Sequence, residues 1–184
     1  MDLRVRKLKN IELNRLSIDD FKSEKKNEIV VVLDDVRSMN NVGSIFRTCD
    51  CLGIRKIYLC GITGRPPHRD IHKTSLGAEN SVDWEFHENI ETLILSLKID
   101  NYLIVGLEQT DQSKDIRNFV TNSKPMAIIV GNEIEGISDN ALAECDDILE
   151  IPQFGTKHSF NVAVSCGIAL WELINKDRSA DDKD

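Results

Sequence analysis

The sequence predicts an α/β domain in which helices cover both faces of a mainly parallel sheet. Short apolar runs rich in β-branched residues recur along the chain, with helical patterns between most of them. Several runs are apolar at every position, as strands must be when helices cover both faces of a sheet. The predicted strands are Ile29–Leu33, Lys56–Cys60, Tyr102–Leu107, Met126–Val130 and Ile148–Ile151, with Val82–Phe86 as a further candidate.

The N-terminal segment 1–26 is more polar and is predicted to form a basic arm or helical pair. Ser17 begins the pattern Ser17-Ile-Asp-Asp20, which is typical of a helix N-cap. The cations of the arm are Arg4, Arg6, Lys7, Lys9, Arg15, Lys22, Lys25 and Lys26. We expect the domain itself to span residues 27–176 and residues 177–184 to form a disordered acidic tail.

The segment from Asn40 to Gly53 is predicted to be an amphipathic helix, with Gly53 as its C-terminal stop. Its apolar residues fall on one face at helical spacing: Val42, Ile45, Phe46, Cys49 and Leu52. Arg47 projects more than ~100° away from that stripe, so it faces solvent, a partner or a ligand. An arginine in such a position is most often simply solvated.

A glycine-containing loop leaves the predicted strand Met126–Val130 and enters a helix capped by Ser138. Its sequence is Val130-Gly-Asn-Glu-Ile-Glu-Gly-Ile-Ser138. In open α/β sheets, ligands bind beyond the carboxyl ends of the strands. We therefore expect Glu133 at a binding site. The alternative is an ordinary connecting loop with exposed acidic residues.

The segment from Glu150 to Asn161 links the last predicted strand to a helix through Ile168-Ala-Leu-Trp171 that is apolar nearly all round. Such a helix is expected to be buried on most sides, in part by another subunit. Ser159 and Asn161 stand at its predicted start. The alternative to a functional role is that Ser159 is an N-cap and Asn161 a local hydrogen-bonding residue.

Composition indicates a soluble globular chain of 184 residues, with 41% hydrophobic and 29% charged residues. The formal net charge of −8 counts against nucleic-acid binding, because phosphate contacts need lysine and arginine. The charges are unevenly distributed, however. A second basic group, Arg65, Arg69 and Lys73, is expected on a loop, whereas acidic residues gather at 146–147 and 181–184. A solvated basic face is the alternative to an RNA-binding role.

No apolar run approaches the ~18 residues of a membrane span, and no signal peptide is present, so a cytoplasmic location is expected. The five cysteines form no C-x-x-C pair. They suggest neither a disulfide framework nor a zinc site, and we expect small core residues in a reducing compartment.

Three other chemistries are weighed and disfavoured. The phosphate-binding pattern G-x-x-x-x-G-K-[ST] is absent. The adjacent residues His158 and Ser159 would point in different directions, which disfavours a hydrolase pair. His68 and His72 have helical metal-site spacing, but they follow Pro66-Pro67 without a third ligand, so a surface loop is the favoured interpretation and no metal is expected.

Three motifs, taken together, identify a family. They are N-x-G-x-x-x-R from Asn41 to Arg47, V-G-N-E-x-x-G from Val130 to Gly136, and I-P-x-x-G-x-x-x-S-x-N-V from Ile151 to Val162. In this order, and over roughly Ile29 to Leu173, the chain resembles the SpoU/TrmH family of SPOUT RNA 2′-O-methyltransferases. Each motif alone is weak, but the combination is specific.

The resemblance implies a deep C-terminal trefoil knot, a rare exception to the rule that folds are unknotted. It also implies a homodimer and S-adenosylmethionine as cofactor, held by backbone groups of the knot loops. By position in the motifs, the donor would be lined by Gly131, Ile151 and Phe160, with Leu107 after the fourth strand.

The implied reaction is methyl transfer to a ribose 2′-hydroxyl of RNA, with tRNA favoured over rRNA and guanosine as a candidate nucleotide. Arg47 is then the expected activator. A guanidinium is almost never neutral, so we favour phosphate binding and alkoxide stabilisation over a role as base. Asn41 and Ser159 would orient the arginine or ribose, Asn161 would fix its loop, and Glu133 would anchor the hydrogen bonds. A catalytically inactive knotted RNA-binding module is the alternative.

Overall fold

The computed structural model describes residues 5–121 and 124–181. In this part of the chain seven strands form one sheet in the order β3-β2-β1-β6-β4-β7-β5, and every pair is parallel. The strands are β1 (Asn27–Asp34), β2 (Ile54–Cys60), β3 (Trp84–His87), β4 (Leu103–Leu107), β5 (Lys114–Asp115), β6 (Met126–Val130) and β7 (Asp147–Glu150). The predicted strands are confirmed; β5 was missed because two residues carry no periodicity.

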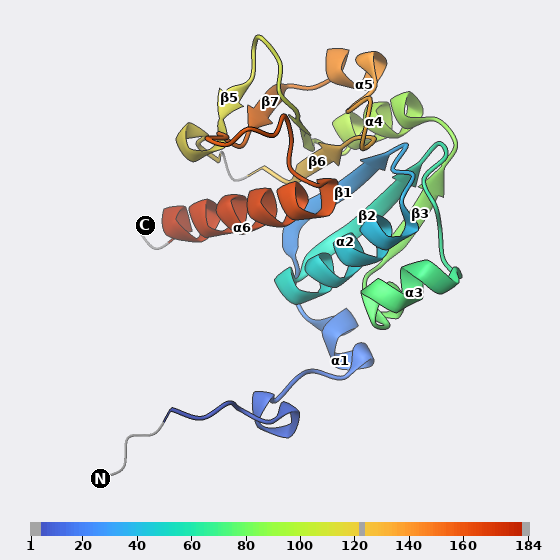
Figure 1. Cartoon of the computed structure of the whole chain (residues 1–184), viewed down its shortest axis with the longest axis vertical. Coiled ribbons are helices and arrows are strands. Elements are labelled where there is room, and N and C mark those ends of the chain that lie inside the picture. The colour runs from blue at the N-terminus through green and yellow to red at the C-terminus, as the bar shows by residue number, and fades with distance from the viewer. Residues whose placement is uncertain (1–4, 122–123, 182–184) are drawn as a thin grey trace.

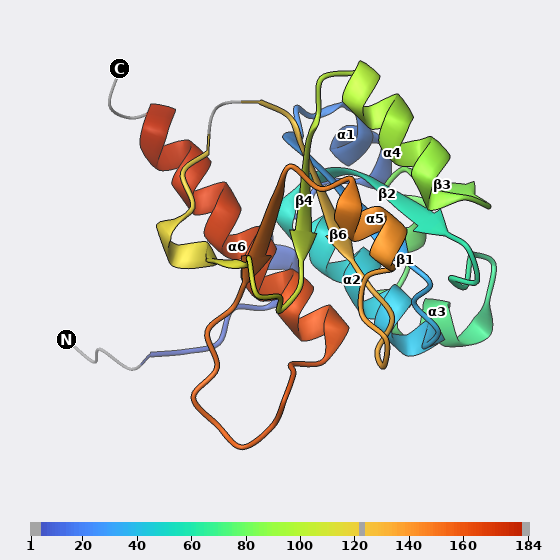
Figure 2. The ribbon, with the colours of Figure 1, turned by 90° about the horizontal axis from the view of Figure 1, so that it is seen from above.

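Helices cover both faces of the sheet, as predicted (Figures 1 and 2). One face carries α2 (Met39–Leu52), α3 (Arg69–Ser75) and α6 (Val162–Asp181), and the other carries α4 (Ile90–Ile99) and α5 (Asp139–Ala143). The remaining elements are η1 (Asn10–Leu13), α1 (Ile18–Ser23), η2 (Ala78–Asn80) and η3 (Ile116–Asn118). The trefoil knot implied by the resemblance stays a prediction.

The central strand β1 explains why the sheet needs two helical layers. Val31 and Leu33 belong to the core beneath α2 and α6, whereas Val30 and Val32 belong to the core beneath α4 and α5. Successive strand residues point to opposite faces, so both sets must be covered. This arrangement leaves only the ends of the strands open to ligands.

Helix α2 confirms the amphipathic helix predicted from the sequence. Ser38 caps its N-terminus by accepting a hydrogen bond from the Asn41 amide at 3.4 Å, and Gly53 ends it with a positive φ of 62°. Its apolar stripe is buried, and Arg47 is exposed as the helical geometry predicts.

The β2–α3 connection differs from the expected surface loop. Arg69, His72 and Lys73 lie on helix α3, and His68 caps it by accepting from the Asp70 amide at 3.2 Å. The helix is short, so local propensity alone would not stabilise it. Burial of Ile71 within the core that includes α2 does so.

Helix α6 also differs from the sequence prediction. It begins at Val162, because Asn161 rather than Ser159 accepts a hydrogen bond from the Ala163 amide, at 3.0 Å. It continues to Asp181, so residues 177–181 are helical instead of part of a disordered tail, and residues 182–184 lie outside the described part. One face of the helix, described below, is exposed within the single chain.

The N-terminal arm extends away from the body of the molecule (Figure 1). Ser17 caps α1 as predicted, accepting from the Asp20 amide at 3.1 Å, and Phe21 packs against the main core. Arg4 lies outside the described residues.

The sequence led us to expect cysteines in the core and no membrane-spanning segment. Cys49, Cys60 and Cys166 are buried and Cys145 is partly buried, but Cys51 is exposed, so its assignment to the core was wrong. In the part of the chain that the structure describes, no helix has both the length and the apolar character needed to span a membrane.

Candidate functional site

A pocket of about 350 Å³ opens where β4, β6 and β7 end. Residues from segments 107–109, 130–136, 149–153 and 159–165 line it. The first three segments follow or end neighbouring parallel strands, and the fourth enters α6. The location is therefore the one where open α/β sheets bind ligands.

The loop after β6 shapes the pocket floor. Asn132 and Gly136 exchange two backbone hydrogen bonds, at 2.9 and 3.0 Å, and Gly136 has a φ of 73°. This folds the loop so tightly that a Cβ at Gly131 would lie 2.1 Å from the Gly136 carbonyl carbon. The motif glycines are thus required by backbone geometry.

Glu133, at the tip of this loop, is tied to the start of α2. Its Oε1 accepts hydrogen bonds from Asn41 Nδ2 at 2.8 Å and from the Ser38 amide at 3.0 Å, while Oε2 accepts from the Arg37 amide at 3.1 Å. Partial desolvation alone would raise the pKa of Glu133, but the hydrogen bonds from Asn41 and the backbone amides outweigh it and lower the pKa.

Asn161 joins the third motif to the same network. Its Nδ2 donates to Asn41 Oδ1 at 3.1 Å. A continuous chain of side chains, Asn161 to Asn41 to Glu133, therefore connects the start of α6, the start of α2 and the loop after β6. The three motifs, which are far apart in the sequence, meet at one place.

The structure gathers most of the predicted site residues around the pocket. Leu107, Gly131, Ile151 and Phe160, predicted from the resemblance to line a donor site, all line it. Glu133, Ser159 and Asn161 line it too. Ser159 makes no hydrogen bond with the other described residues, so its hydroxyl is free for a ligand.

Arg47 is the exception, since it does not line the pocket. It follows Asn41 by six residues on the same helix, which is about 9 Å at ~1.5 Å per residue, and it points in a different direction. Among the described residues, Arg47 forms no hydrogen bond or ion pair, and Asn41 does not contact it through one. That Asn41 orients the arginine or the ribose stays a prediction.

Glu108 is a pocket residue that the sequence reasoning missed. Its Oε1 accepts from the Gln109 amide at 2.9 Å and its Oε2 accepts from the Ile137 amide at 3.1 Å, which joins the loops after β4 and β6. Gln109 Nε2 in turn donates to the His158 carbonyl at 2.8 Å. The available signal was a carboxylate directly after a buried strand.

The buried carboxylate of Asp34 holds the segment that follows the loop after β6. Asp34, at the end of β1, is 3% exposed and accepts from the Ser138 amide at 2.8 Å. Burial raises the pKa of Asp34, and the hydrogen bond from Ser138 opposes that effect. Ser138 precedes α5 as predicted, but its side chain makes no capping hydrogen bond.

The lining of the pocket suits a ligand with a flat apolar part and a positive charge. Leu107, Leu149, Ile151 and Phe160 supply apolar surface, and the carboxylates of Glu108 and Glu133 supply negative charge. A volume of about 350 Å³ is within the ~300–1,000 Å³ of small-molecule sites.

Comparison with known proteins gives the family. The sequence profile of the SpoU rRNA Methylase family matches residues 28–171, which include all three motifs. The chain belongs to the SpoU rRNA methylase family.

Curated relatives of this SpoU chain modify two kinds of RNA. A tRNA (guanosine(18)-2′-O)-methyltransferase from Thermus thermophilus is 29% identical over 88% of this chain and 81% of its own length. A 23S rRNA (guanosine-2′-O-)-methyltransferase from Vibrio cholerae is 26% identical over 90% of this chain and 66% of its own length.

Solved structures agree with the fold of this SpoU domain. The A. aeolicus TrmH/SpoU tRNA modifying enzyme aligns with a TM-score of 0.79 and 27% identity, covering 89% of this chain and 83% of that one. An AdoMet-bound rRNA methyltransferase from Sinorhizobium meliloti aligns with a TM-score of 0.77 and 29% identity, covering 84% of this chain and 59% of that one.

Proposed function

We propose that this SpoU protein is an S-adenosylmethionine-dependent RNA methyltransferase that modifies a ribose 2′-hydroxyl. The observation that carries the proposal is the pocket at the ends of β4, β6 and β7, where the hydrogen-bonded chain Asn161–Asn41–Glu133 joins the three family motifs. Relatives with this activity bind or modify tRNA and rRNA by name.

S-adenosylmethionine matches the chemistry of the pocket, and it would supply an activated methyl group on a sulfonium. Leu107, Ile151 and Phe160 offer apolar contact for an adenine ring. Gly131 has no side chain, which lets the loop after β6 fold back onto Gly136 and Ile137 and so shapes the floor of the pocket. The carboxylates of Glu108 and Glu133 offset the positive charges of such a ligand.

The remaining site residues would prepare the RNA. Methyl transfer is an in-line displacement, so the site must align a 2′-hydroxyl and help to remove its proton. Because Arg47 does not line the pocket, we assign it to the RNA: it binds a phosphate beside the target and stabilises the forming alkoxide. Ser159, with its free hydroxyl at the pocket, orients the ribose.

Asn41, Asn161 and Glu133 act as positioning residues in this scheme. Their hydrogen bonds hold the start of α6 and the loop after β6 against α2, the helix that carries Arg47. Loss of any of them would shift the RNA-binding side relative to the donor pocket. A displacement of about 1 Å can cost ~100-fold in rate.

We favour tRNA over rRNA as the substrate, with guanosine as the candidate nucleotide. The tRNA (guanosine(18)-2′-O)-methyltransferase of T. thermophilus is 29% identical to this chain, and the rRNA enzyme of V. cholerae is 26% identical. An RNA substrate also supports the expected cytoplasmic location.

A homodimer belongs to the proposal because α6 exposes an apolar stripe. Val164, Ile168 and Trp171 are 50%, 39% and 62% exposed and recur at i, i+4 and i+7, so they share one helix face. A second copy of the chain would cover that face. The trefoil knot implied by the family would lie in the C-terminal part of the chain, which includes α6.

The direct test is methyl transfer from labelled S-adenosylmethionine to unmodified tRNA transcripts and rRNA, followed by mapping of ribose 2′-O-methyl groups. Label in tRNA ribose, lost when the target nucleotide is replaced by its 2′-deoxy form, supports the proposal. Donor binding without transfer to any RNA would instead support the inactive RNA-binding module.

A further inference from the structure

The cations of this acidic protein divide into two groups. Many that lie outside the N-terminal arm are neutralised by a carboxylate: Arg55 by Glu28, Lys56 by Glu85, Lys98 by Glu144, Lys114 by Asp147, Arg117 by Asp115 and Lys176 by Glu172. Arg65, Arg69 and Lys73, by contrast, are exposed and form no ion pair within the described residues. Their charge is available to a partner.

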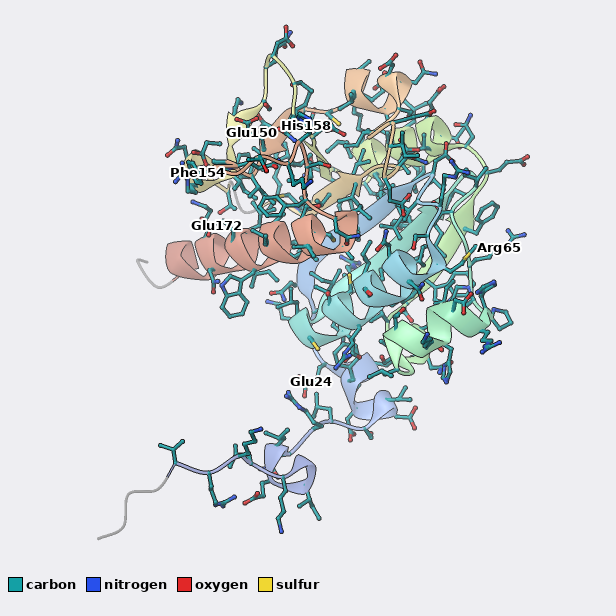
Figure 3. All side chains as sticks on the ribbon, viewed as in Figure 1. Glu24, Arg65, Glu150, Phe154, His158 and Glu172 are labelled. Atoms are coloured by element: carbon teal, nitrogen blue, oxygen red, sulfur yellow. The ribbon has the colours of Figure 1, made fainter. Side chains whose placement is uncertain are left out.

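These three cations lie together around α3. Arg69 and Lys73 are one turn apart on that helix, so they share a face. Arg65 precedes the helix (Figure 3). Its guanidinium stacks on the Phe86 ring at 4.2 Å from the centroid, which orders the side chain without neutralising it.

A cleft of about 410 Å³ lies beside them. Its lining includes Pro66, His68, Arg69, His72 and Glu79. The Glu79 carboxylate is turned inward: it meets His72 Nδ1 at 2.5 Å and accepts from the Ser75 hydroxyl. Its side chain is 10% exposed, and its oxygens are engaged by His72 and Ser75. Asp70 is the exposed carboxylate of the helix.

The helix that borders the cleft, α3, packs against the side of α2 that carries Arg47. Helix α3 packs on α2 at Gly43, where a Cβ would lie 2.1 Å from Thr74 Oγ1, and Thr74 Oγ1 donates to the Asn40 carbonyl at 3.0 Å. Arg47 follows Gly43 by four residues, so it lies one turn further along the same side of α2. Arg47 therefore lies on the side of α2 against which the helix bearing Arg69 and Lys73 packs.

We propose that this surface, the α3 cleft with Arg65, Arg69 and Lys73, binds the sugar–phosphate backbone of the substrate RNA beside the nucleotide held at Arg47. The proposal rests on the proposed function and names a second RNA contact outside the methyl-transfer site. It explains how a chain with net charge −8 engages a polyanion: Arg65, Arg69 and Lys73 outnumber the one exposed carboxylate of α3, Asp70, whereas many cations elsewhere are paired.

RNA is favoured over an acidic protein because of where the cations are placed. Arg69 and Lys73 lie on α3, which packs against the side of α2 that carries Arg47, the residue assigned to the target phosphate. A backbone that enters the site must leave it past neighbouring surface, and α3 is the element that packs against this side of α2. An acidic protein partner would not need a binding surface next to Arg47.

The test is the affinity of the full-length protein for an unmodified tRNA transcript, without donor, over a range of KCl concentrations. Each phosphate contact contributes about 0.7–0.9 to the slope of log K against log salt. The triple variant R65Q/R69Q/K73Q should reduce that slope by about 2 to 3 and weaken binding at least tenfold at physiological salt. D70N should strengthen binding, because it removes the exposed carboxylate.

The matched control is R55Q/K98Q/K114Q, which removes the same charge from cations that are already paired and lie elsewhere on the sheet and on α4. If both triple variants change the slope equally, the proposal is wrong. It is also wrong if polyglutamate at equal charge concentration displaces RNA from the wild-type protein but not from the α3 triple variant, because the surface would then recognise acidic polypeptide.

The two proposals fail separately. If the wild-type protein transfers no methyl group but the α3 variant still loses RNA affinity, the proposed function falls and the binding surface stands. If transfer occurs and the α3 variant binds RNA as well as R55Q/K98Q/K114Q does, the proposed function is supported and the proposed binding surface is wrong. Thermal unfolding of each variant verifies that these exposed substitutions leave the fold intact.

Discussion

Asn41 Nδ2 lies 2.8 Å from Glu133 Oε1 although the residues are 92 positions apart in the chain. This hydrogen bond fastens the loop after β6 to the first turn of α2, and Asn161 extends it to α6. The donor pocket and the proposed RNA-binding side of α2 are thereby held in a fixed position relative to each other. The predictions below test that arrangement.

Glu133→Gln should lower the rate of methyl transfer by about 10- to 100-fold. The amide replaces one acceptor oxygen by a donor that faces the Arg37 or Ser38 amide, so the loop shifts. Single-turnover kinetics at saturating donor and RNA would measure the effect. Glu135→Gln, an exposed neighbour on the same loop, is the control and should retain wild-type rates.

The same glutamate predicts a pH dependence of stability. The pKa of Glu133 is lower in the folded protein than its usual 4.5, so the ionised carboxylate stabilises the fold above that value. This contribution is lost as the pH falls through the lowered folded-state pKa. Melting temperatures of the wild type should therefore fall more steeply than those of Glu133→Gln below about pH 4.5. Parallel curves would contradict the role of Glu133 as an ionised anchor.

Arg47→Ala should abolish transfer, with a loss of at least about 100-fold, while leaving donor affinity and stability unchanged. Arg47 is exposed, lies outside the pocket and forms no hydrogen bond within the described residues. Transfer assays, calorimetric titration with S-adenosylmethionine and thermal unfolding measure the three quantities. Retained activity would contradict the mechanism, and lost donor affinity would place Arg47 in the pocket after all.

Gly131→Ala should weaken S-adenosylmethionine binding at least about tenfold. Its Cβ would lie 2.1 Å from the Gly136 carbonyl carbon and 2.2 Å from the Ile137 nitrogen, so the pocket floor must move. Gly155→Ala is the matched control, because a Cβ there meets nothing within 4 Å. If the two variants bind the donor equally well, the floor of this pocket is not part of the donor site.

Trp171→Glu should raise the dimer dissociation constant by at least about 100-fold, since association would bury an unpaired charge. Analytical ultracentrifugation over a concentration series measures it. Ile99→Glu is the control: Ile99 is 85% exposed and ends α4, on the opposite face of the sheet. A monomeric wild type, or a dimer that Trp171→Glu leaves intact, would show that α6 is not the interface.

Sequence reasoning succeeded where local pattern and short motifs carry the information. The strands β1 and β6 were predicted because the runs Ile29–Leu33 and Met126–Val130 are apolar throughout, and α2 because its apolar residues recur at helical spacing. The pocket residues Gly131, Ile151 and Phe160 came from motif positions, and the structure brings them together. These features are local, so neighbouring residues specify them.

Other features depended on contacts between distant segments. Helix α3 forms because Ile71 is buried in the main core, Asn161 is held at the start of α6 by its hydrogen bond to Asn41, and Glu108 joins two loops by accepting from the Ile137 amide. The local sequence does not show these partners, although it does place the Glu108 carboxylate directly after an apolar strand. A short helix or a partly buried carboxylate is stabilised by partners that only the folded chain provides.

Arg47 shows the division most clearly. The sequence by itself determined its family motif and its outward direction, because helical periodicity fixes which face a residue occupies. Only the tertiary structure placed it outside the donor pocket and on the side of α2 against which α3 packs. That placement depends on how helices pack across the sheet, which periodicity within one helix does not encode.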